Sequence, residues 1–361
     1  MKKVKILHVI GYLGCGGDTT AVNNVRKYID LNGKKFQFDF VTHEGYNKDF
    51  VNQLEKEKCK IYVLDGDVRK IGAYKYFKEI RKILKENQYD AVHFHTSFQS
   101  AIGLLAAYSC GIKKRICHSH TTNVQRKISF FKKITYLPIC RMLINVLSTK
   151  KIGCSKIANE FLFGKHVKST IIYNGLDINN ILNVKIDEKG IEKKYNFDKY
   201  TKIIGQVGRI TDMKNPYFTI ELAKQMKDYN CLFVMLGTGN LFDEIKVKIE
   251  EEKLKNVIMV GFTNDVYSYM KYFDYLILPS KYGEGLPVVL IEEQIVNEQC
   301  ICIANNTVSE ESNLGNVRFI DINDIDKWVS LIKESSPKVN KINYDRFDIN
   351  NTAEDWLAVY K

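Results

Sequence analysis

The sequence has no long hydrophobic run and no paired cysteines. No window of its 361 residues holds the eighteen or so uncharged apolar residues that a membrane-spanning helix needs. The first residues lead directly into a strand-like run, Val4–Ile10, so we expect no signal peptide. The nine cysteines are odd in number and form no Cys-x-x-Cys pair, which argues against a disulfide framework. We therefore expect a soluble protein of the reducing cytoplasm.

Negative charge is scarce in the first half of the chain. The net charge is +12, and residues 1–172 carry 31 Lys and Arg against 13 Asp and Glu, whereas residues 173–361 carry 23 against 29. This asymmetry predicts that the first half meets an anionic partner. Nucleic acid is not expected as that partner, because the charges and aromatic residues follow no recognisable nucleic-acid-binding module.

Short apolar strands alternate with amphipathic helices along the whole chain, which predicts an α/β fold with parallel sheets. The strands fall into two series, separated by a stretch rich in Asn, Asp, Gly and Lys between residues 173 and 200. The expected strands are Val4–Ile10, Phe36–Thr42, Ile61–Leu64, Ala91–His95, Arg115–His118 and Lys151–Cys154, then Lys202–Val207, Cys231–Leu236, Val257–Val260, Tyr275–Leu278 and Cys300–Ile303. The sequence therefore predicts two domains.

The segment from Tyr275 to Glu292 combines a buried strand, a glycine-bracketed loop and a helix start. Pro287 suits the first helical position, where its missing N–H costs nothing. Glu284 and Glu292 would then flank the free N–H groups and the positive dipole end of the helix. Two carboxylates around an anion site suit a nucleotide sugar, with hydroxyls at both ends and phosphate between them. A Glu pair at this spacing also fits a solvated helix face.

A second candidate anion site lies in residues 205–216, Gly-Gln-Val-Gly-Arg-Ile-Thr-Asp-Met-Lys-Asn-Pro, which follow another apolar strand. The Arg209 guanidinium is a rigid fork and the Lys214 ammonium a compact point charge. Together they can neutralise an anionic ligand. Basic residues at the end of a strand also occur simply as solvated side chains.

These two segments resemble the signature motifs of the retaining glycosyltransferases of family 4. The resemblance extends from Gly14 to the C-terminal helix and implies the GT-B fold, which consists of two facing Rossmann-like domains. Asn174-Gly175-Leu176-Asp177 is similar to the family's domain junction. We expect an N-terminal domain of residues 1–172, joined by a returning helix within 341–361, and a nucleotide-sugar-binding domain of residues 173–340.

The resemblance also implies roles for single residues. Arg209 and Lys214 would hold the diphosphate, Glu284 the donor sugar and Glu292 the ribose. The expected catalytic residues are His120, Arg209, Lys214 and Glu284. The other expected donor-binding residues lie in or beside glycine-rich turns: Gly16, Gly17, Gly208, Gly237, Thr238, Phe262, Thr263, Gly285 and Leu286.

Two histidine pairs, His93-x-His95 and His118-x-His120, stand at the ends of successive expected strands. Alternation along a strand puts the members of each pair on one face. Four imidazoles could form a zinc site. The resemblance instead assigns His120, with His118 as its rival, to the donor sugar and the approach of the acceptor. His93 and His95 would line the wall of the cleft or be satisfied by the backbone.

A segment that interleaves basic and apolar residues follows the second histidine pair. Such a pattern suits a segment lying on an anionic membrane surface. It equally suits a helix that packs its apolar stripe on its own domain. The residues expected to meet the membrane or the acceptor are Arg126, Lys127, Phe130, Phe131, Lys132 and Lys133.

The resemblance predicts an enzyme that transfers a sugar from a nucleoside diphosphate to a glycan acceptor with retention of configuration. UDP is the expected nucleoside diphosphate. The acceptor is expected to be lipid-linked, as on a polyprenyl diphosphate, in cell-surface polysaccharide synthesis at the inner face of the membrane. No metal or other cofactor is expected, since the protein's own cations would hold the diphosphate. A nucleotide-sugar epimerase of the same fold and a non-catalytic, nucleotide- or lipid-binding subunit are the alternatives.

Overall fold

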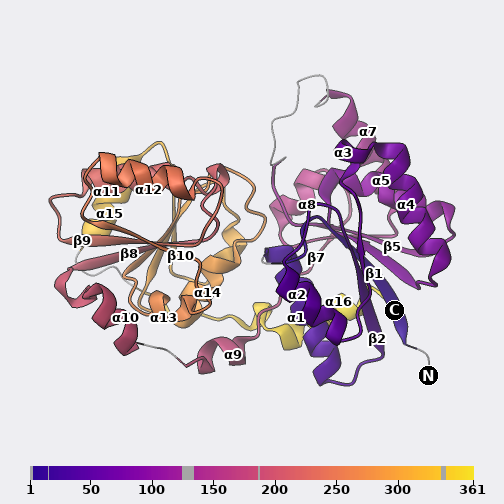
Figure 1. The fold of residues 1–361 in the computed structure, drawn as a ribbon, viewed down its shortest axis with the longest axis horizontal. Helices are drawn as coiled ribbons and strands as arrows, with labels where there is room; N and C mark the ends of the chain where they lie inside the picture. Colours follow the sequence, from indigo (N-terminus) through magenta and orange to yellow (C-terminus); the bar gives the residue numbers. More distant parts are fainter. Residues whose placement is uncertain (1–2, 15, 124–133, 186–187, 335–338) are drawn as a thin grey trace. The chain divides into compact units, whose positions relative to one another are not determined.

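The computed structural model describes residues 3–14, 16–123, 134–185, 188–334 and 339–361. It divides into two compact units, Met1–Asp177 with Asp345–Lys361, and Ile178–Tyr344. The division therefore follows Asp177 instead of residue 172, and the returning segment begins at Asp345 instead of residue 341. Each unit is a parallel sheet with helices on both faces, in agreement with the expected α/β fold (Figure 1).

Unit 1 contains a seven-stranded sheet in the order β3-β2-β1-β4-β5-β6-β7. The strand order reverses beside β1, which pairs with both β2 and β4, as in other doubly wound sheets. The strands are β1 (Val4–Ile10), β2 (Phe36–Thr42), β3 (Ile61–Val63), β4 (Ala91–Phe94), β5 (Lys114–Ser119), β6 (Lys150–Gly153) and β7 (Thr170–Ile171).

The helices of unit 1 bury one apolar layer on each face of this sheet. One face is covered by α3 (Val68–Ile71), α4 (Ala73–Glu86), α5 (Ser100–Ser109), α7 (Tyr136–Leu147) and α8 (Lys156–Phe163). The other is covered by α1 (Gly17–Leu31), α2 (Lys48–Lys56) and α16 (Ile349–Ala358). The C-terminal helix α16 lies beside α1, so the end of the chain does return to the first unit (Figure 1).

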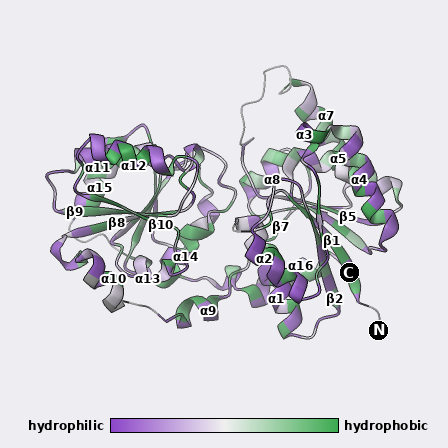
Figure 2. Ribbon diagram, in the orientation of Figure 1, coloured by the Kyte–Doolittle hydropathy of each residue, from purple (hydrophilic) through white to green (hydrophobic). Residues whose placement is uncertain are grey.

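Unit 2 contains a six-stranded sheet in the order β10-β9-β8-β11-β12-β13. Its strands are β8 (Lys202–Val207), β9 (Cys231–Leu236), β10 (Val257–Gly261), β11 (Tyr275–Leu278), β12 (Ile301–Asn305) and β13 (Val317–Ile320). The helices are α9 (Ile178–Asn183), α10 (Glu188–Tyr195), α11 (Pro216–Gln225), α12 (Phe242–Glu251), α13 (Val266–Met270), α14 (Val288–Val296) and α15 (Ile325–Lys333). The strands of both units carry the hydrophobic residues that form these cores (Figure 2).

Candidate active site

Four neighbouring strands of unit 2 end in the segments that the sequence marks as functional. Gly208 follows β8, Gly237 follows β9, Gly261 ends β10, and Glu284 lies in the loop after β11. Backbone hydrogen bonds join the turns: Gly208 N–H donates to Leu236 O over 3.0 Å, and Gly237 N–H donates to Gly261 O over 2.8 Å. Open α/β sheets bind ligands at this carboxyl edge.

Gly237 is required by the close approach of two of these turns. Its φ is +126°, a value that favours glycine, and a Cβ atom there would lie 2.1 Å from the carbonyl oxygen of Gly208. Gly208 has a φ of +142°, and its Cβ position lies 3.5 Å from Cε of Lys214. The absence of side chains at Gly208 and Gly237 therefore lets the two turns and the Lys214 side chain pack closely at this edge of the sheet.

Lys214 and Glu284 form an ion pair, with 2.6 Å between Nζ and Oε1. The hydroxyl of Ser280 donates to the same carboxylate oxygen over 2.8 Å. The Lys214 and Glu284 side chains are only 15% and 9% exposed, so water screens the pair weakly. The sequence motifs predicted both residues for one ligand but did not predict this contact between them.

Buried polar residues hold the two partners in place, and the sequence reasoning missed them. Gln206 donates from Nε2 to the carbonyl of Lys214 over 2.9 Å and accepts from the hydroxyl of Thr219 over 2.8 Å. Asn305 donates from Nδ2 to the carbonyl of Ser280 over 2.8 Å. The available signal was a polar residue inside or at the end of an apolar strand, since such a group needs a partner when buried.

The remaining expected donor residues differ in exposure. Arg209 and Thr238 are exposed, Phe262 is 64% exposed, and Thr263 is half-buried. Arg209 forms no ion pair with any residue that the structure describes. These four residues follow the ends of β8, β9 and β10. They remain predicted donor contacts.

Helix α14 begins one residue later than expected. Its first residue is Val288, and Pro287 occupies the N-cap with extended backbone, φ −74° and ψ 96°. Gly285 and Leu286 precede the cap and are buried. The prediction that Pro287 takes the first helical position is therefore wrong by one residue, because Pro287 has not yet entered the helical conformation.

Glu292 lies on α14 and is half-buried. The hydroxyl of Tyr267 on α13 donates to its Oε1 over 3.0 Å. Burial raises the pKa of the Glu292 carboxyl, and the Tyr267 hydrogen bond opposes that rise. The interpretation of the Glu pair as a solvated helix face is wrong, since Glu284 is buried and Glu292 is half-buried.

The glycine pair of the first unit stands at the start of a helix. Gly16 is the N-cap of α1 and Gly17 is its first residue. The Thr19 hydroxyl donates to the carbonyl of Tyr12 over 3.0 Å and ties the helix start to the loop after β1. A helix start with glycine at the cap exposes N–H groups, as an anion site requires.

His118 lies on β5, and His120 follows the last residue of that strand. The two side chains differ in solvent exposure. His118 is fully buried, whereas His120 is half-buried and lies just after the strand. Nε2 of His120 lies 2.8 Å from Nδ1 of His95. Burial lowers the pKa of His120 to about 3, so its imidazole is neutral.

The partners of His93 and His95 correct one expectation. Nδ1 of His93 lies 2.6 Å from the Tyr360 hydroxyl, and Nε2 of His95 lies 3.1 Å from Nδ1 of His8. These histidine side chains are therefore held by other side chains and not by the backbone. The backbone interpretation failed because the strand order of unit 1 places β1 beside β4, which brings His8 opposite His93.

The expected membrane residues Arg126, Lys127, Phe130, Phe131, Lys132 and Lys133 lie outside the described residues. The neighbouring helix α7 is described, and it exposes Ile139, Met142 and Val146 by 53%, 58% and 74%. These three positions are spaced three and four residues apart, so they form one apolar stripe. No described helix is both long and apolar enough to span a membrane.

Two Asp-x-Asp triplets, a pattern that can bridge a diphosphate through a metal, occur in the chain: Asp65-Gly66-Asp67 and Asp324-Ile325-Asp326. Both serve helix starts. The Asp67 side chain accepts from the Arg69 and Lys70 N–H groups at the start of α3. Asp324 accepts from the Lys327 N–H group at the start of α15. Neither triplet lies among the four loops that form the candidate site.

Comparison with known families assigns both halves of the chain. Residues 22–180 match the family model described as "Glycosyltransferase Family 4", and residues 187–336 match the model described as "Glycosyl transferases group 1". The chain belongs to the glycosyltransferases with the GT-B fold.

Individual relatives agree with that assignment. This glycosyltransferase is 26% identical over 374 residues to the capsular polysaccharide biosynthesis glycosyltransferase CapH of Staphylococcus aureus, covering 99% of this chain and 98% of CapH. It is 28% identical over 279 residues to an Escherichia coli UDP-Gal:alpha-D-GlcNAc-diphosphoundecaprenol alpha-1,3-galactosyltransferase, covering 72% of this chain and 70% of the relative. These relatives place the chain among glycosyltransferases of polysaccharide biosynthesis.

A solved structure agrees in fold. HepE of Anabaena, crystallised in complex with UDP and glucose, matches with a TM-score of 0.76 at 16% identity, over 98% of both chains. At this identity the match concerns the fold alone, and it bears out the expected GT-B architecture.

Proposed function

We propose that this glycosyltransferase transfers a sugar from a UDP-sugar to a lipid-linked glycan acceptor, with retention of anomeric configuration. The observation that carries the proposal is the buried Lys214–Glu284 pair, which stands among the glycine turns of four adjacent strands. A site with a cation, a carboxylate and the N-terminal end of a helix suits a sugar joined to a diphosphate. The names of the E. coli galactosyltransferase and of HepE support UDP and a lipid-linked acceptor.

The donor diphosphate would lie between Arg209, Lys214 and the start of α14 near Gly285 and Leu286. Arg209 is exposed and can turn toward a ligand, whereas Lys214 is already fixed by Glu284. Gly208 and Gly237 keep side chains out of this region. Preorganised cations lower the energy of the departing diphosphate most, because its charge grows in the transition state.

Glu284 would accept hydrogen bonds from donor sugar hydroxyls, and Glu292 from the ribose. Thr238, Phe262 and Thr263 would stand near the nucleotide. In unit 1, Gly16, Gly17 and His120 are the proposed donor and acceptor contacts. Glu284 already neutralises Lys214, so a role as covalent nucleophile is disfavoured. We infer that the acceptor attacks on the face of the departing diphosphate, which takes its proton and so gives retention.

The proposed chemistry uses no divalent cation at the diphosphate. Arg209 and Lys214 supply the positive charge that Mg²⁺ would otherwise bring. Transfer rates are therefore expected to be equal with and without added Mg²⁺ or Mn²⁺. A strict requirement for either ion would contradict this part of the proposal.

The acceptor would be met at an anionic membrane surface. The exposed apolar stripe of α7 and the net charge of +18 on residues 1–172 support that location. Amphipathic surfaces of this kind bind membranes through apolar burial together with attraction to anionic lipids.

Release of UDP from a panel of UDP-sugars, with and without membrane extract, tests the function. Acceptor-stimulated release from one donor is expected, and Lys214→Ala should nearly abolish it while the fold persists. Lys224→Ala is the matched control, because Lys224 is exposed and forms an ion pair with the half-buried Glu252 in the same unit. Donor isomerisation without acceptor would indicate an epimerase. UDP binding without release from any donor would indicate a non-catalytic subunit.

A further inference from the structure

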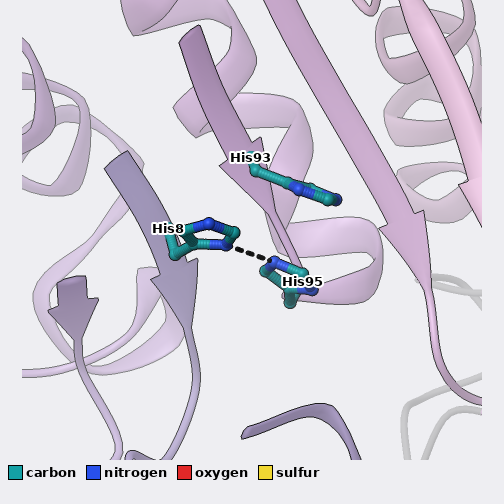
Figure 3. Close-up of side chains that lie close together, drawn as sticks. All are labelled: His8, His93 and His95. Atoms are coloured by element: carbon teal, nitrogen blue, oxygen red, sulfur yellow. Dashed lines mark hydrogen bonds between the residues drawn. The ribbon is translucent and has the colours of Figure 1, made fainter. Parts of the chain in front are cut away.

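Five histidines gather on one face of the unit 1 sheet, beneath Trp356 and Tyr360. His8 lies on β1, His93 on β4 and His118 on β5, while His95 and His120 follow the ends of β4 and β5. The rings of His93 and His118 are 5.3 Å apart, and those of His118 and His120 are 4.0 Å apart. Figure 3 shows His8, His93 and His95, with the hydrogen bond between His8 and His95.

Several of their ring nitrogens form no hydrogen bond with the described residues. Nε2 of His8 and His93, both nitrogens of His118 and Nδ1 of His120 are buried without a hydrogen-bond partner among the described residues. Each buried polar group without a hydrogen-bond partner destabilises the folded state. Such groups are rare in native proteins, so several in one cluster require an explanation.

The cluster has the chemistry of a ligand set for a transition metal. One nitrogen from each of His95, His118 and His120 lies within 4.8 Å of the others, and the same holds for His8, His93 and His95. Neutral imidazole is the form of histidine that binds metal ions.

We propose that His95, His118 and His120 bind one Zn²⁺ or a similar borderline divalent transition-metal ion. Zinc–nitrogen bonds of about 2.0–2.1 Å place tetrahedral ligands about 3.3 Å apart, so ring nitrogens that lie within 4.8 Å of one another would have to move closer by at most about 1.5 Å. His120 is half-buried, which leaves a side from which the ion can enter and a water molecule can serve as fourth ligand. Three histidines with an open fourth position form a known zinc geometry.

His8 orients the proposed ligand His95. His95 would bind the ion through Nδ1, the atom that faces His120, and donate its Nε2–H to Nδ1 of His8, 3.1 Å away. Metal-bound histidines usually donate their other ring N–H in this way, which fixes the tautomer. The alternative set of His8, His93 and His95 is buried on every side, so a fourth ligand has no access.

The proposed ion shares His120 with the proposed donor and acceptor contacts, but it has no part in holding the diphosphate. Its three ligands lie in unit 1, whereas Arg209 and Lys214, which would hold the diphosphate, lie in unit 2. Sugar transfer by a chain that binds no zinc would refute only the zinc site. Zinc binding by a chain that uses no UDP-sugar would refute only the proposed function.

Zinc content and affinity of the tag-free full-length chain test the proposal. We expect one equivalent of zinc after dialysis, and cobalt substitution should give the intense visible bands of a tetrahedral site. His118→Gln and His120→Gln should abolish tight binding, and His8→Gln should weaken it by roughly 10–100-fold. His166→Gln, at an exposed histidine, is the matched control and should bind as wild type.

His120→Gln, at the half-buried position, is expected to fold, and thermal unfolding checks this for every variant. The proposal is overturned if the purified chain binds no zinc in competition with a chelator. It is equally overturned if His118→Gln and His120→Gln bind zinc as wild type does. Loss of zinc binding in His93→Gln but not in His118→Gln would show that His8, His93 and His95 bind the ion, and it would refute the proposed ligand set.

Discussion

Nζ of Lys214 lies 2.6 Å from Oε1 of Glu284, although the two residues come from the ends of different strands. Their contact exists because β8 and β11 are neighbours in the sheet. The pair gives the candidate site a fixed cation whose carboxylate partner can also meet a sugar.

Removing one partner of this pair should cost more than removing both. Lys214→Ala leaves the Glu284 carboxylate buried without its cation, and Glu284→Ala leaves the ammonium without its anion. We expect a coupling energy of about 0.5–3 kcal/mol from a double-mutant cycle in urea unfolding. Lys224 and Glu252, whose side chains are 47% and 30% exposed, should show a coupling below about 1 kcal/mol. Equal coupling in the two cycles would show that burial does not strengthen the Lys214 pair.

Gly237→Ala should destroy donor binding. The new methyl group would lie 2.1 Å from the carbonyl oxygen of Gly208, so the turns after β8 and β9 would have to separate. Gly33→Ala is the control, because its φ of +58° is also positive but no atom lies within 4 Å of the added Cβ. Isothermal titration with UDP should detect no binding by Gly237→Ala and wild-type affinity for Gly33→Ala. Normal UDP affinity in Gly237→Ala would exclude these turns from the site.

Charge on the α7 stripe should weaken membrane association. Met142→Glu and Val146→Glu place carboxylates at positions that are 58% and 74% exposed, so the fold should tolerate them. We expect both variants to sediment less than wild type with vesicles of mixed neutral and anionic phospholipid. Val247→Glu, at a 52% exposed position of unit 2, should sediment as wild type does. If the α7 variants keep full vesicle binding, the stripe has another purpose.

The fold could be predicted largely because buried parallel strands are continuous apolar runs, and nearly all of them stand out in the sequence. The strands β7 and β13 were missed. β7 has only two residues, both exposed, and β13 has half-buried residues in its middle, so neither forms an apolar run. Both are edge strands, where burial imposes less pattern on the sequence.

Single site residues could be predicted where they belong to a local sequence motif. Contacts between them could not be predicted where they depend on which strands are neighbours in the sheet. Glu284 and Lys214 each belong to a motif, but their pairing depends on β8 lying beside β11. His8 joins the histidine cluster for the same reason, since β1 pairs with β4. Gln206 lies within the segment of residues 205–216 but was assigned no role there, and its role became visible only with its hydrogen bonds.

Acid should destabilise unit 1 through His43, a histidine outside the cluster. Burial lowers the pKa of His43 to about 4, and its Nδ1 lies 3.2 Å from the Tyr76 hydroxyl. The unfolded chain takes up this proton near pH 6.5 while the folded chain does not, so stability falls as the pH drops from 6.5 toward 4. The loss at pH 5.5 should be about 1.4 kcal/mol.

His43→Gln should lack this part of the pH dependence, which urea unfolding at pH 7.5 and pH 5.5 would measure. His166→Gln is the control, since that histidine is exposed. Identical pH slopes for wild type and His43→Gln would mean that His43 is already protonated in the folded protein near pH 6.

The position of α16 has a consequence for synthesis of the chain. Trp356 and Tyr360 cover the histidine face of a sheet whose strands all precede residue 172, so these covering residues are synthesised after the whole sheet. Unit 2 is inserted in the chain between β7 and α16, so it can finish folding before α16 covers its part of the first sheet. A premature stop that removes only the final turns would therefore damage the part of the protein that was made first.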